Sequence, residues 1–157
     1  MAIETGDAIA KFGTADEITV ASPSAIDGND GISTTSDINE WTDDDDALTY
    51  VVVFKGTYAA VPDSGTLDLY VTLNEVDTST GDEPTMDSAF DGIYLGSRTP
   101  DAVTSEQNLV FGPFQLPKTK TSQPYQFYFK NAQGDAAHDI SSGWSAWIIP
   151  QTAGAHS

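Results

Sequence analysis

Strict alternation in one nine-residue segment limits the fold more than any other feature of the chain. From Thr66 to Asn74, an aliphatic residue occupies every second position, and the positions between hold Asp, Tyr, Thr and Asn. The aliphatic set is Leu67, Leu69, Val71 and Leu73. A period of two over this length is typical of a β-strand that buries one face. The segment therefore predicts a sheet with a second layer packed on its leucine face.

Five further segments have the composition of strands. Residues 48–55 are β-branched and aromatic on both faces, as expected for a strand at the centre of a sheet. The others are 90–96, 107–116, 124–130 and 145–150. Gly112-Pro113 interrupts one of them and predicts an edge strand or a bulge there. Glycine or proline separates the segments, and no helical stripe occurs, so we predict an all-β chain, an antiparallel β-sandwich or jelly roll.

The first 46 residues differ from the rest. They are rich in Ser, Thr, Asp, Gly and Ala and have weak periodicity. We interpret 1–46 as an extended, irregular N-terminal arm with loops, 47–151 as the β-sandwich domain and 152–157 as a flexible tail.

Acidity excludes several classes of partner. Six basic residues against 24 acidic ones give a net charge of −18. Such a field repels phosphate backbones and anionic lipid, so neither nucleic acid nor membrane is an expected partner. Twelve of the 24 acidic residues precede Ala47, where Lys11 is the single base, whereas bases dominate from Ala102 to Gly134. This asymmetry would let copies of the chain pack against one another.

The chain has neither the basic and apolar regions of a signal peptide at its start nor an apolar run of the roughly 20 residues that span a bilayer. A soluble protein is expected. Because the chain has no cysteine, disulfides and thiolate metal sites are excluded.

No metal or cofactor site is predicted. Residues 27–31 superficially resemble a calcium loop, but the fifth position is Gly31 and the twelfth is Ile38, where the loop needs a bidentate Glu. The run Asp43-Asp44-Asp45-Asp46 cannot turn all four carboxylates toward one ion. Zinc would depend on the two imidazoles of the chain, His138 and His156.

Catalysis lacks a recognisable constellation. A serine triad would need one of the two histidines, and no G-x-S-x-G turn accompanies them. Paired carboxylates stay open as an alternative, since 24 acidic residues offer many pairs. We predict that the chain is not an enzyme.

Exposed aromatic rings offer a second kind of site, because they can stack on sugars. The candidates are Trp41, Tyr58, Trp144 and Trp147. Trp144 and Trp147 are three residues apart in a strand-like context, so they point to opposite faces. Core or interface packing is favoured over glycan binding for these rings.

From Ala47 onward the chain resembles small bacteriophage virion proteins with jelly-roll-like folds. The resemblance covers about the last two-thirds of the chain and rests on turns and core strands. Its elements are the apolar strand before Gly56, 64–70, 90–96, 114–117, 128–134 and the strand from Trp147 to Pro150. It implies a role in the particle, as a head decoration or cement protein or as a neck or tail component, and it implies no catalytic residue.

This resemblance also implies the partners: the major capsid protein or other virion proteins, and neighbouring copies, within a virion assembled in the host cytoplasm. We expect the arm, Ala2 to Glu40, to make the main contacts, so that deleting it abolishes incorporation and leaves the sandwich folded. The expected contact residues are Ile3, Ile9, Phe12, Ile18, Val20, Ile26, Ile32 and Trp41. The alternative is a carbohydrate-binding sandwich, or a tail or neck component, that attaches to the host surface.

Overall fold

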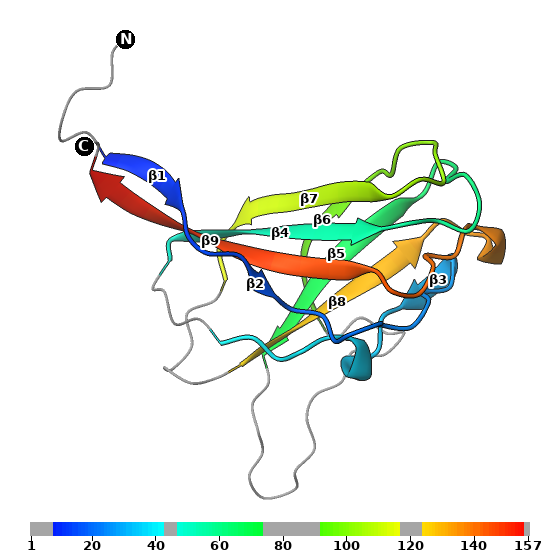
Figure 1. The fold of residues 1–157 in the computed structure, drawn as a ribbon, viewed down its shortest axis with the longest axis horizontal. Helices are drawn as coiled ribbons and strands as arrows, with labels where there is room; N and C mark the ends of the chain where they lie inside the picture. The colour runs from blue at the N-terminus through cyan, green and yellow to red at the C-terminus, as the bar shows by residue number, and fades with distance from the viewer. Residues whose placement is uncertain (1–7, 43–46, 74–91, 117–123, 156–157) are drawn as a thin grey trace, which may run out of the picture.

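The computed structural model describes residues 8–42, 47–73, 92–116 and 124–155, and over these ranges the chain is all-β (Figure 1). Two antiparallel sheets pack face to face as a β-sandwich. The first sheet contains β1 (Ala8–Phe12), β2 (Asp16–Glu17), β4 (Thr49–Gly56), β7 (Gln107–Phe114) and β9 (Ser145–Ala155). The second contains β3 (Asn29–Ile32), β5 (Thr66–Leu73), β6 (Ile93–Arg98) and β8 (Tyr125–Ala132). Two short 3₁₀ helices, η1 (Thr35–Asp37) and η2 (Ala136–His138), lie in connections.

Strands distant in sequence are neighbours in both sheets. In the first, β1 and β2 lie on one edge of β9, and β4 and then β7 follow on its other side. The second sheet has the order β3-β8-β5-β6. Each sheet is thus four strand positions wide, because β1 and β2 share one edge position.

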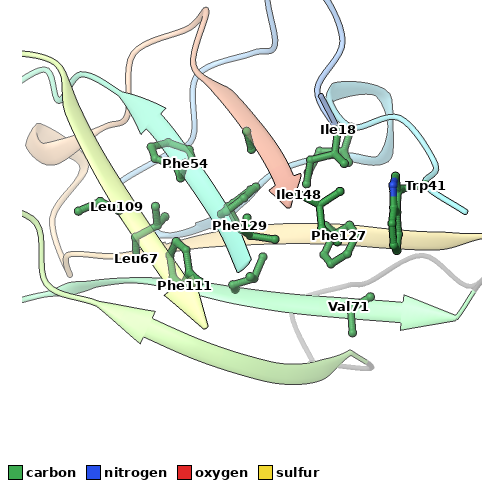
Figure 2. Packing of buried hydrophobic residues seen from close by; sticks show 14 of the residues in the cluster. Ile18, Trp41, Phe54, Leu67, Val71, Leu109, Phe111, Phe127, Phe129 and Ile148 are labelled. Atoms are coloured by element: carbon green, nitrogen blue, oxygen red, sulfur yellow. The ribbon is translucent and has the colours of Figure 1, made fainter. Parts of the chain in front are cut away.

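The alternating segment forms β5, a strand that buries its aliphatic face as the pattern predicts. In β5, Leu67, Leu69 and Val71 are fully buried, and the strand pairs with β6 on one side and β8 on the other. Phe127 and Phe129 of β8 point into the same interior (Figure 2). These side chains and those of the opposite sheet form one continuous apolar core.

Strand β4 and edge strand β7 also agree with their sequence patterns. β4 lies between β9 and β7, and Tyr50, Val52 and Phe54 enter the core. β7 is the last strand of its sheet, and its register with β4 shifts near Gly112-Pro113. Proline is tolerated on an edge strand because the N–H that it lacks is not needed for a hydrogen bond to a further strand.

An irregular arm over 1–46 is not confirmed. β1, β2 and β3 pair with β9 or β8, and four apolar residues of this range are buried in the core. These are Ile18, Ile26, Ile38 and Trp41. The pairing segments are two to five residues long, too short to leave a period in the sequence. At the other end, β9 continues to Ala155, so residues 152–155 are strand and not tail.

Candidate functional site

One end of the first sheet extends past the sandwich as a pair of strands. β4 pairs with β9 only as far as Gln151, whereas β1 pairs with β9 from Gln151 to Ala155. We call residues 8–12 and 151–155 the ribbon. Figure 1 shows it leaving the body of the sandwich at the end where β1 begins and β9 ends.

The outer edge of β1 offers backbone groups for hydrogen bonding. The Gly13 N–H donates to the Pro150 carbonyl at 2.8 Å, which fixes the phase of the ladder. Along an antiparallel strand, successive residues direct their backbone N–H and C=O groups to opposite sides. Ala8, Ala10 and Phe12 therefore direct these groups away from β9. Among the described residues, β1 has no strand partner on that side.

Exposed apolar side chains lie where the ribbon joins the sandwich. Phe12 is 67% exposed and Leu48 is 62% exposed. Phe12 lies opposite Gln151 on one side of β9, and the Leu48 N–H donates to the Gln151 carbonyl on the other side. The base of the ribbon therefore presents apolar surface beside both of its edges.

The edge strands β6 and β7, on the opposite side of the sandwich, are irregular, because each shifts register against its neighbour. Arg98, at the end of β6, donates from Nε to the Val110 carbonyl of β7, and its guanidinium lies 5.9 Å from the centre of the Phe111 ring. Pro113 has no N–H to offer. Side-chain capping, proline and bulges are the usual means by which edge strands avoid pairing.

Edge strands β2 and β3 are short, and each carries charged side chains. β2 has two residues, both acidic, and the Asp16 carboxylate accepts a hydrogen bond from Trp41 Nε1 at 3.2 Å. β3 carries a register shift and places Asp30 at positive φ. The Asp30 carboxylate forms an ion pair with Lys130 at 2.9 Å. The five-residue, regularly paired edge of β1 is thus unlike the other edges.

The end opposite the ribbon is fixed by hydrogen bonds between loops. Ile26 and Ile140 exchange backbone bonds of 3.0 and 2.9 Å, and Asn131 Nδ2 donates to the carbonyls of Ile26 and His138. The Asp139 carboxylate accepts from the Gly28 N–H at 2.8 Å. We call this set of contacts, within 23–28, 57–65 and 131–144, the loop end.

A buried carboxylate holds another turn close to the core. Asp37 accepts bonds from the Ser24 N–H at 2.8 Å and from both the N–H and the hydroxyl of Thr34. Burial alone would raise the pKa of Asp37, but these donors outweigh it and hold the pKa below its ordinary value of 3.8. The carboxylate is a structural anchor for the 24–37 segment.

The predicted contact residues are divided by the structure. Ile18, Ile26 and Trp41 are in the core, so the folded domain cannot present them to a partner. Val20 and Ile32 are partly exposed, and Phe12 is the most exposed large apolar residue described. Ile9 is a residue of β1, and Ile3 lies outside the described residues. Sequence composition drew attention to this region but could not separate core positions from the edge.

Three of the four aromatic residues proposed for glycan stacking are buried. The ring of Trp144 stacks on Phe54 at 5.4 Å, and its Nε1 donates to the Ser24 carbonyl at 2.7 Å. Trp41 packs against Tyr50 at 5.4 Å, and Tyr58 is 3% exposed. Trp147 alone among the four is partly exposed. The preference for core packing is confirmed for Trp144, and Trp147 does face the other side.

Within 8–42, 47–73, 92–116 and 124–155, no group of three or more His, Cys, Asp or Glu side chains could hold a metal ion. In the 27–31 turn, the Asp27 carboxylate accepts the Asn29 N–H at 2.7 Å, and so caps its own loop. The run 43–46 and His156 lie outside the described residues. His138 belongs to η2. In the same part of the chain, no helix is long and apolar enough to cross a membrane.

Comparisons with known proteins give no further constraint, because no family model, curated protein or solved structure matches the chain.

Proposed function

We propose that the chain is a non-enzymatic structural protein of a virion, a decoration or cement protein whose sandwich is a jelly roll. The order of the strands carries this proposal. Counting β1 and β2 as one position, eight positions form two sheets, and the chain changes sheet at every connection except that between β5 and β6. This alternation is what two interlocked Greek keys produce, and jelly rolls of this kind build viral capsids.

The ribbon supports the same proposal from a different direction. A protein that cements a shell needs a rigid body and a separate element that pairs with its neighbours. The loop end supplies rigidity, and the open edge of β1 supplies backbone groups for an added strand. Contacts of this kind are weak singly and become strong when many copies bind one lattice.

The contact surface that we propose is smaller than an arm from Ala2 to Glu40. Deleting that whole range would remove β2, β3 and the buried Ile18 and Ile26, so it would unfold the sandwich instead of sparing it. The informative truncation ends before Gly13 and leaves these residues in place.

Mass spectrometry of purified virions tests the proposal. We expect the chain in the particles at a copy number comparable with that of the shell subunit, and loss of the chain from particles when residues 1–12 are deleted. A few copies per particle would indicate a neck or tail component instead. Particles without the chain, or normal loading of the truncated chain, would contradict the proposal. Circular dichroism of the truncated chain is the control for its fold.

A further inference from the structure

We propose that the β1 edge binds the β1 edge of a second copy of this chain, in an antiparallel arrangement with two-fold symmetry. The two ribbons would then form one continuous four-stranded sheet between two sandwiches. This inference deepens the proposed function and rests on it for its biological role, because a symmetric contact between copies is what links neighbours on a shell.

The need for a further strand follows from the size of the ribbon. Beyond Gln151, β9 pairs with β1 and, among the described strands, with no other. An isolated pair of strands is marginally stable in water, and three or more strands are needed for independent stability. Adding a strand to β1 satisfies the outward backbone groups of Ala8, Ala10 and Phe12.

A second copy fits this edge because the edge is complementary to itself. In an antiparallel pairing centred on Ala10, Ala8 of one copy lies opposite Phe12 of the other. Each residue whose N–H and C=O groups point outward then lies opposite another such residue. Lys11 then lies opposite Ile9. Shifting the centre to Lys11 would place two residues of like charge at opposite positions, which is unfavourable. The register centred on Ala10 avoids this repulsion, and an isologous contact of this kind closes as a dimer.

Charge also favours contact at the ribbon over contact elsewhere. The chain carries −18 in total, yet Lys11 is the single charged residue among the ten residues of the ribbon. Because the ribbon projects from the sandwich, two copies can join there while their acidic bodies stay apart (Figure 1). Repulsion between the bodies is screened over about 8 Å at physiological ionic strength.

Sedimentation equilibrium of the full chain tests the dimer. We expect a mass of twice 16.7 kDa at about 100 μM protein, because a five-residue edge contact is small and predicts a micromolar dissociation constant. Ala10→Pro removes the central outward N–H and should weaken the dimer at least tenfold. Val110→Glu, an exposed position on the edge strand β7, is the matched control and should leave the dimer unchanged.

A charge exchange at the two-fold axis makes the test specific for the register. Ala10 lies opposite Ala10 of the second copy, so Ala10→Glu and Ala10→Lys should each be monomeric, and an equimolar mixture of the two should form a heterodimer. Circular dichroism confirms that each variant is folded. A wild-type chain that stays monomeric, an Ala10→Pro chain that dimerises normally, or a mixture that stays monomeric would overturn the inference.

These outcomes are separable from those of the virion proposal. A chain that dimerises through β1 but is absent from particles refutes the virion role and leaves the inference standing. A chain that is present in particles and monomeric in solution, with Ala10→Pro loading normally, refutes the inference alone.

Discussion

The two ends of strand β9 have opposite designs. Near Ser145 the strand begins in the loop end, where Trp144 is packed between aromatic rings and the loops exchange hydrogen bonds across the sandwich. Near Ala155 the same strand ends in the ribbon, where it pairs with β1 and apolar side chains are exposed at the base. The stabilising contacts are concentrated at the loop end. The backbone groups that are available for pairing lie in the ribbon. This separation lets a protein bind through one end without loosening its core.

The loop end should respond most strongly to loss of Trp144. Its ring contacts both Phe54 and Phe129, and its indole N–H satisfies the Ser24 carbonyl. Trp144→Ala should lower the free energy of unfolding by about 3–5 kcal/mol in urea denaturation. Trp147→Ala, three residues along, removes a partly exposed ring and should cost about 1 kcal/mol. Equal losses would mean that the loop end is not the better packed region.

Close backbone approach at Gly28 gives the next largest effect. A methyl group there would lie 2.3 Å from the Asp135 carbonyl oxygen and 2.8 Å from the His138 carbonyl carbon. Both are backbone atoms, so Gly28→Ala should cost about 1–3 kcal/mol. Gly134→Ala has open space but a φ of +77°, and should cost about 1 kcal/mol through backbone strain alone. Thermal unfolding of the two variants compares them, and a less stable Gly134→Ala would contradict this account of the loop end.

A smaller effect is expected at Asp37, and it depends on pH. Its pKa is lower in the folded state, so the carboxylate stabilises the fold above the ordinary value of 3.8, and this contribution is lost as the pH falls through the lowered pKa. Asp37→Asn should therefore cost about 1–3 kcal/mol at neutral pH. The difference from wild type should shrink in denaturation measured below pH 3.8. A difference that is constant with pH would show that the charge of Asp37 is unimportant.

The ribbon end should contribute least to stability. Phe12 is exposed and lies outside the core, so Phe12→Ser should change the free energy of unfolding by less than about 0.5 kcal/mol. Its effect should instead be seen in association, as weaker dimerisation in sedimentation. A large loss of stability would mean that the ribbon is part of the cohesive structure.

Much of the body of the fold could be predicted from the sequence, and the ribbon could not. The period of two in β5 and the apolar residues of β4 indicate buried strands directly. A buried face imposes its pattern on a long strand. The short β2 and β3 leave no such pattern, and Ile18 and Ile26 lie in segments without a sustained apolar period. Their burial depends on hydrogen bonds to Ala146 and Ile140, which are more than 100 residues away in the chain.

The candidate site depended on information that composition does not contain. The regularity of a strand edge depends on contacts such as Arg98 with Val110 and Asp30 with Lys130, each formed between different strands. The contact residues expected from the sequence included Phe12 and Ile9, which belong to the ribbon. They also included residues that are buried in the core. Only the fold distinguishes the two groups.

Hydrogen exchange at two protein concentrations tests the contrast between the two ends most directly. At low concentration, the outward amides of Ala8, Ala10 and Phe12 should exchange rapidly, whereas the Ile26 amide, bonded to the Ile140 carbonyl, should exchange slowly. At high concentration the three β1 amides should become protected, and Ile26 should not change. The account would be contradicted if the β1 amides exchanged at the same rate at both concentrations, or if Ile26 exchanged as fast as they do.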